Sequence, residues 1–124
     1  MNLEDSILRT VRDAIGIGAD SSEFDTELVM HINAALGTLN QNGVGLPVFV
    51  EDDTLTWAQF KDDTQVEGNV YYHMVPLFVK LSTKIIFDPP PPSAVEMYKS
   101  QVDQMLWRLK VAYEGSLMEA DTNA

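Results

Sequence analysis

The sequence contains no cysteine, no long apolar run and few basic residues. Without cysteine the chain can form neither a disulfide framework nor a thiolate metal site. No stretch approaches the roughly 18 consecutive apolar residues that identify a membrane-spanning helix. Residues 1–13 carry acids early and lack a basic segment followed by an apolar one, so we expect no secretory signal. These absences favour a protein of a cytosol, or of a particle assembled there.

The charge of the chain is strongly negative. Nineteen acidic residues against eight basic ones give a net charge of -11, which argues against direct binding to the phosphates of DNA. The acids concentrate in residues 4–27, 51–67 and 114–121, whereas the last two apolar segments are nearer balance. This uneven distribution of charge suits a subunit that meets different neighbours at its two ends. A generally acidic, solvated surface would explain the same charge distribution equally well.

The residue patterns of common catalytic and metal sites are missing. The two G-x-G matches, at residues 16–18 and 43–45, do not join a buried strand to a helix as a dinucleotide site requires. The acidic clusters at residues 51–53 and 62–63 lack the spacing of a calcium-binding loop. Two histidines are too few for a convincing metal cluster, and no serine has the context of a catalytic triad. We therefore expect no enzymatic activity, no cofactor and no metal.

Apolar residues at three- and four-residue spacing predict helices over residues 3–15, 24–41, 66–87 and 94–113. Glycines end the first two, and the pairs Ser22/Asp25 and Ser93/Glu96 have the spacing of a capping box. Pro76 lies inside the third segment, so that helix is either kinked there or begins close to it.

The middle of the chain, residues 44–65, breaks the helical period. Its β-type residues predict a short hairpin or a loop with strand-like edges. Alternatively, Thr56 caps a short turn that contains Trp57 and Phe60. These two aromatic residues are either core anchors, the commoner role, or exposed anchors for a neighbouring subunit, because aromatic side chains dominate interface hot spots.

Taken together, the pattern predicts an all-α fold: a small four-helix bundle with an irregular loop or short β-hairpin between the second and third helices. Residues 1–113 form one helical domain, and residues 114–124 form a flexible tail. Trp107 lies off the apolar stripe of the fourth helix, beside Arg108. Such a tryptophan either packs at the rim of the core or is covered by a partner.

Four consecutive prolines separate the third and fourth predicted helices, in the run Phe87-Asp88-Pro89-Pro90-Pro91-Pro92. A residue before proline is pushed out of the α region, and the proline rings fix an extended path. The connection is therefore a short, stiff elbow that holds two helices at a defined angle. Fixed geometry of this kind serves assembly rather than a chemical reaction.

The run Phe87-Asp88-Pro89-Pro90, followed by a capped helix with Leu106-Trp107-Arg108-Leu109, resembles the head–tail connector proteins of long-tailed bacteriophages. These are also called head-completion or adaptor proteins. The resemblance is best over residues 71–113 and weaker over residues 3–42. The small size, the acidic composition, the four predicted helices and the irregular insertion after the second helix also resemble this family.

The resemblance implies a structural virion protein at the head–tail junction, assembled in the cytoplasm of the bacterial host. About twelve subunits would form a ring below the portal, extend the DNA channel without binding DNA specifically, and support the next connector or stopper protein. For this chain, the resemblance implies that the C-terminal tail binds the portal, with Tyr113, Leu117 and Met118 as the contacting residues. Candidate residues for the subunit interface are Trp57, Phe60, Trp107 and Arg108.

Two other functions are compatible with the residues. An acidic helical module could mimic DNA and inhibit a nucleic-acid-binding protein, if its carboxylates were spaced like phosphates along one face. A small enzyme is the remaining alternative, which the missing catalytic patterns disfavour.

Overall fold

The computed structural model describes the backbone of residues 2–122 and the side chains of residues 2–115. This part of the chain is helical and contains no strand, so the predicted all-α class is confirmed and the predicted β-hairpin is wrong. The four-helix bundle is not confirmed, because a short helix and a 3-10 helix are added in the middle. The elements are α1 (Ile7–Ala14), α2 (Asp25–Gln41), α3 (Trp57–Phe60), the 3-10 helix η1 (Gly68–Tyr71), α4 (Met74–Phe87) and α5 (Pro92–Thr122).

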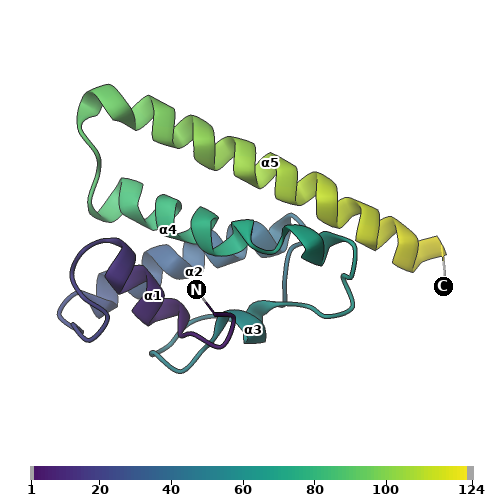
Figure 1. The fold of residues 1–124 in the computed structure, drawn as a ribbon, viewed down its shortest axis with the longest axis horizontal. Coiled ribbons are helices and arrows are strands. Elements are labelled where there is room, and N and C mark those ends of the chain that lie inside the picture. Colours follow the sequence, from purple (N-terminus) through teal and green to yellow (C-terminus); the bar gives the residue numbers. More distant parts are fainter. Residues whose placement is uncertain (1, 123–124) are drawn as a thin grey trace.

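Helix α4 lies at the centre of the fold. It packs against α2 and α1 on one side and against α5 on the other, and η1 also contacts α5. Figure 1 shows α4 and α5 as an antiparallel pair joined by the proline elbow, with α1, α2 and α3 together on the far side of α4. The core between these layers is apolar; among its largest fully buried side chains are Trp57, Tyr113, Phe60, Ile7, Leu8, Leu28, Ile32, Leu36, Leu39 and Leu109.

The first helix begins later than its apolar pattern predicts. Ser6 is its N-cap, and the Ser6 hydroxyl accepts a hydrogen bond from the Arg9 amide at 3.2 Å. The residues around the start of α1 form hydrogen bonds with the middle of the chain. The Leu3 carbonyl accepts a hydrogen bond from the Ala58 amide at 2.8 Å, and the Ile7 amide donates one to the Leu55 carbonyl at 2.9 Å. The N-terminal segment therefore pairs with the middle of the chain instead of extending the helix.

A buried arginine ties α1 to the start of α2. Arg12 is only 4% exposed, and its guanidinium donates two hydrogen bonds to the Asp25 carboxylate, the one from Nε at 2.9 Å. A third donor reaches the Ala19 carbonyl at 2.9 Å. Such bidentate pairing satisfies a cation that would otherwise be costly to bury. It also explains why the predicted Ser22/Asp25 capping box is wrong: the N-cap is Phe24, with no side-chain cap, and the Asp25 carboxylate is already bound to Arg12.

At Val50, in the middle segment, a side chain and not a second strand satisfies the backbone. The Asn33 amide group on α2 accepts from the Val50 amide at 2.7 Å and donates to the Val50 carbonyl at 2.9 Å. This is the pairing that a neighbouring strand would have supplied, so no hairpin is needed. The alternative prediction for Thr56 is confirmed, because Thr56 and Gln59 form a capping box at the start of α3.

The proline inside the third predicted helix marks its start. Helix α4 begins at Met74, which places Pro76 in the first turn, where its missing amide would have had no helical partner. The kink is therefore not needed, and the alternative prediction of a start near Pro76 is confirmed. The preceding residues form η1 instead of continuing the α-helix.

Helix α5 begins at Pro92 and continues to Thr122. Proline is favoured at the first position of a helix because its φ angle is already helical. Ser93 therefore lies inside the first turn, and the predicted Ser93/Glu96 capping box is wrong. The helix runs past residue 113 without a break, but the domain boundary there and the flexibility of residues 114–124 stay predictions.

One close contact fixes α5 against η1. The Tyr113 ring lies so near Gly68 that a Cβ at position 68 would come within 2.5 Å of it. The Tyr113 hydroxyl donates to Asn69 Oδ1 at 2.9 Å, and the side chain is fully buried. The absence of a side chain at Gly68 is thus what allows the ring of Tyr113 to pack there.

We expect Gly68→Ala to lower the free energy of unfolding by about 1–3 kcal/mol, as overpacking of a filled core does. The matched control is Gly115→Ala on α5, where a Cβ would lie an ordinary 3.5 Å from Glu67. Alanine in a helix interior is favoured over glycine by about 0.5–1 kcal/mol, so the control should be stabilised. Urea unfolding followed by circular dichroism measures both, and equal effects of the two substitutions would contradict the packing argument.

Candidate functional site

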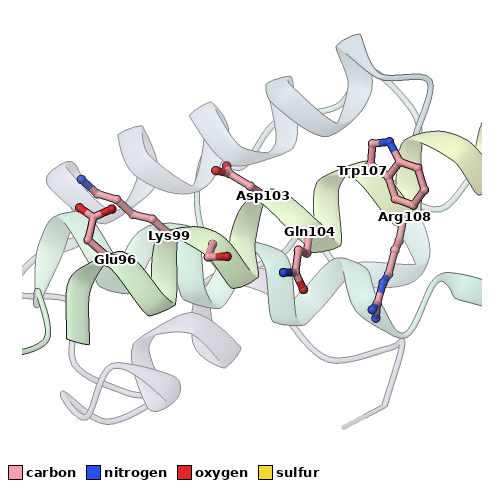
Figure 2. A pocket seen from close by; sticks show the side chains of 7 residues that line it. Glu96, Lys99, Asp103, Gln104, Trp107 and Arg108 are labelled. Carbon is pink, nitrogen blue, oxygen red and sulfur yellow. The ribbon is translucent and has the colours of Figure 1, made fainter. Parts of the chain in front are cut away.

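The outer face of α5 carries a continuous stripe of exposed polar side chains that ends in a tryptophan. Figure 2 shows its side chains along the helix: Glu96, Lys99, Asp103, Gln104, Trp107 and Arg108. Residues three and four apart share a helix face, so this spacing places all of them on one side. Charges of both signs alternate along the stripe, and all six residues are exposed.

The stripe faces solvent because the opposite face of α5 packs against the core. Met105, Leu109 and Tyr113 are buried at four-residue spacing and contact the core. Val102 and Leu106 are partly buried beside them. The apolar pattern of the sequence therefore predicts which face of α5 points inward, and the stripe is what remains for solvent or a partner.

Trp107 and Arg108, predicted as interface residues, lie together at the surface. The Trp107 side chain is 64% exposed, and with Tyr71, Met74 and Val111 it lines a groove between α5 and the start of α4. Arg108 lines the same groove, and it forms no ion pair with any residue whose side chain is described. A large exposed aromatic beside an arginine is the composition typical of interface hot spots.

Trp57 and Phe60, the other two predicted interface residues, are fully buried in the subunit. The Trp57 indole Nε1 donates to the Thr10 hydroxyl at 3.2 Å, and its carbonyl accepts a hydrogen bond from the Tyr72 hydroxyl. The structure thus gives both aromatics the role of core anchors, and neither has exposed atoms with which to contact a neighbour directly. Their part in a subunit interface stays a prediction.

The three residues predicted to bind a portal fall into two groups. Tyr113 is a buried core residue whose hydroxyl is bound to Asn69, so in this fold it positions α5. The side chains of Leu117 and Met118 lie outside the described residues, and the proposed contact with a portal stays a prediction for all three.

The sequence-based candidates include only Trp107 and Arg108 of the groove, and among the groove residues they miss are Tyr71 and Val111. Tyr71 is 45% exposed and Val111 is 46% exposed. Val111 could have been found because it follows Trp107 by four residues and so continues the same helix face. Tyr71 gave no such signal, because the sequence placed it inside a continuous third helix instead of in η1.

The described residues contain no group of three or more histidine or acidic side chains arranged to hold a metal ion. Nor does any helix in this part of the chain combine the length and apolarity needed to cross a membrane. The acidic residues are unevenly placed: residues 1–67 hold thirteen acids and three bases, whereas residues 68–124 hold six acids and five bases. The α4–α5 pair that carries the groove is therefore much less negative than the rest of the molecule.

Burial perturbs the two tyrosines that connect α3, η1 and α5. Desolvation, with a smaller contribution from Asp62, raises the pKa of Tyr113 from 10.0 to about 12. Desolvation and the proximity of Tyr113 raise the pKa of Tyr72 as well. Both hydroxyls are therefore kept neutral by the fold, in the form that can donate to Asn69 and to the Trp57 carbonyl.

Comparison with known proteins gives one match. A family model described as phage connector protein matches residues 7–116, which is most of the chain and includes every described element of the groove. Searches of curated proteins and of solved structures returned no match.

Raising the pH should destabilise the fold through Tyr113. The unfolded tyrosine ionises near pH 10, whereas in the folded chain its pKa is about 12, so the folded state binds more protons between these values. The stability contributed by the neutral form is complete below pH 10 and is lost as the pH rises towards 12. Urea unfolding from pH 8 to 11.5 measures the effect.

Tyr113→Phe provides the control for this pH dependence. It should lower the free energy of unfolding by about 1 kcal/mol at pH 8, the usual value of one hydrogen bond. The decline above pH 10 should become shallower but should persist, because burial also raises the pKa of Tyr72, so the folded state keeps that proton where the unfolded state loses it. An unchanged slope in this variant would contradict the assignment to Tyr113.

Proposed function

The chain belongs to the phage connector protein family, and from this we propose that it forms a ring below the portal that joins the phage head to the tail. The family match over residues 7–116 carries the general conclusion, a structural component of the junction between head and tail. The ring, its position below the portal and its partners are the proposal. We propose no enzymatic activity and no cofactor.

A closed ring requires two different surfaces on each subunit, one for each neighbour. The molecule offers such a difference. The exposed Trp107 and Arg108 lie on α5, whereas thirteen of the nineteen acidic residues lie in residues 1–67, the part of the chain that contains α1, α2 and α3. Figure 1 shows α5 on one side of α4 and α1, α2 and α3 on the other. Unlike surfaces with unlike charge support head-to-tail association over a two-fold dimer.

The negative charge of the subunit supports a role in extending the DNA channel. A channel through which DNA must pass should not hold it, and carboxylates on the wall repel the phosphates. Exposed acids of α1 and of the loop that follows it are suited to this, for example Asp13 and Glu23. We propose that DNA crosses the ring without sequence-specific contacts.

The end of α5 supports contact with a portal protein. Figure 1 shows this end projecting beyond the other helices, so it is the part of the subunit best placed to reach a second ring. The opposite side of the ring would receive the next connector or the stopper protein. The complete particle would be a virion assembled in the cytoplasm of the bacterial host.

Binding to the portal tests this function directly. The full chain should co-sediment with purified portal rings of the same phage, and electron microscopy should show an added ring below each portal. The proposed ring assembles on the portal, so both measurements are made with the portal present. Failure to bind the portal would overturn the proposal.

The stiffness of the elbow gives a second test. Replacing Pro89, Pro90, Pro91 and Pro92 by glycine should leave the helical circular dichroism spectrum unchanged, because only Pro92 lies in a helix. The flexible connection should nevertheless weaken ring formation on the portal, since the angle of α5 is no longer fixed. Replacing Ser21 and Ser22, in the loop before α2, by glycine is the matched control. Normal ring formation by the proline variant would contradict a role for elbow stiffness.

A further inference from the structure

The α4–α5 pair exposes two unlike surfaces at its opposite ends, and neither is used within the subunit. At one end is the proline elbow, where the four prolines form a hollowed apolar surface with Val95 and Glu96. At the other end is the groove around Trp107, lined also by Tyr71, His73, Met74, Arg108 and Val111. Figure 1 shows the elbow and the start of α4 at opposite ends of the helix pair.

The elbow has the chemistry of a proline-rich ligand. Pro89, Pro91 and Pro92 are exposed, and residues 89–91 are in neither helix. Because proline rings hold the chain extended before any contact is made, such a segment loses little conformational entropy on binding. Its carbonyl groups and apolar pyrrolidine rings are available to a partner surface.

The groove has the chemistry of a receptor for such a ligand. Proline-rich segments bind in grooves lined by aromatic side chains, where their rings pack against the aromatic faces. Trp107 and Tyr71 present two exposed aromatic side chains here, and Val111 supplies an apolar surface beside them. An exposed patch of this kind between two helices is typical of an interaction site.

The charges beside the two surfaces are complementary. Asp88 and Glu96 flank the elbow, whereas Arg108 and His73 line the groove. Glu96 and Arg108 form no ion pair within the part of the chain that the structure describes, whereas Asp88 is paired with Lys84 at 3.5 Å. Docking of the elbow in the groove would bring Glu96 near Arg108, which favours this partner and this orientation.

The elbow cannot occupy the groove of its own subunit. Trp107 lies fifteen positions after Pro92 in the continuous helix α5, which corresponds to about 22 Å along the axis. The occupant must therefore come from another molecule, and a second copy of this chain carries the matching segment. One copy would donate its elbow and offer its groove to the next, as head-to-tail association requires.

We propose that the proline elbow of one subunit docks in the Trp107 groove of the next subunit. This inference rests on the proposed ring, and it identifies the surfaces that form the contact between neighbours. It assigns Trp107, Tyr71 and Val111 as the receptor and Pro89–Pro92 as the ligand, with Arg108 and Glu96 as the charge pair that sets the orientation.

Cysteine cross-linking tests the contact, because the natural chain has no cysteine. Pro90→Cys and Val111→Cys are made in separate chains, mixed in equal amounts on purified portal and mildly oxidised. A disulfide-linked dimer should form several-fold more in this mixture than with either variant alone. Pro90→Cys mixed with Thr26→Cys, an exposed position on α2, is the matched control.

The outcomes distinguish the contact from the ring itself. A ring seen by electron microscopy without the specific cross-link would overturn the contact and leave the proposed function standing. No ring on the portal for the natural chain would overturn the proposed function and the contact with it. The cross-link in the specific mixture, absent from the control, supports both.

Charge reversal gives an independent measurement. Arg108→Glu and Glu96→Arg should each reduce the fraction of portals that carry a ring, while thermal unfolding stays unchanged because both side chains are exposed. The double variant restores opposite charges across the contact and should recover ring formation. A double variant as defective as the worse single one would contradict the charge pairing of elbow and groove.

Discussion

The position of α5 depends on the contact between the Tyr113 ring and Gly68. Among the side chains of α5 that the structure describes, at residues 92–115, three are buried, and all lie in the second half of that range: Met105, Leu109 and Tyr113. Tyr113 is the largest of them, it is hydrogen-bonded to Asn69, and its ring occupies the space that any side chain at Gly68 would fill. The first half of α5 is held by partly buried residues and by the elbow. The groove and the outer stripe exist because these two attachments fix the helix to α4 and η1.

The same arrangement separates the stabilising residues from those available to partners. Trp57 is buried between α1 and the middle segment, whereas Trp107 stands in solvent on α5. Arg12 is buried and paired with Asp25, whereas Arg108 is exposed and unpaired within the described chain. In each case a residue of the same type serves the core in one place and the surface in another. Residue type alone therefore does not determine whether such a side chain is buried or exposed. The helices and loops that surround it determine this.

The helices and the apolar face of α5 could be predicted from the sequence, because helical period and burial follow the same pattern. The same pattern indicates that Trp107 is exposed, because Trp107 lies off the apolar face of α5. The middle segment was mistaken for a possible hairpin because its β-type residues are satisfied by a distant side chain, Asn33, which no local pattern reveals. Ser22 and Ser93 have the spacing of capping boxes but do not form them. The Asp25 carboxylate that would complete the box with Ser22 is bound to Arg12. Ser93 lies inside a helix that already begins at Pro92. Tyr71 was missed because the groove is made by residues far apart in the sequence.

The uneven charge of the subunit gives it an electric dipole. Residues 1–67, with α1, α2 and α3 on one side of α4, hold most of the net charge of -11, whereas residues 68–124, with α4 itself and α5 on its other side, are nearly neutral. When identical subunits are related by rotation about one axis, the components of their dipoles perpendicular to that axis cancel and the parallel components add. Any tilt of α4 out of the plane of such a ring would therefore produce an electrostatic field directed along the axis. The two openings of the ring would then differ in potential, and a charged polymer would distinguish entry from exit.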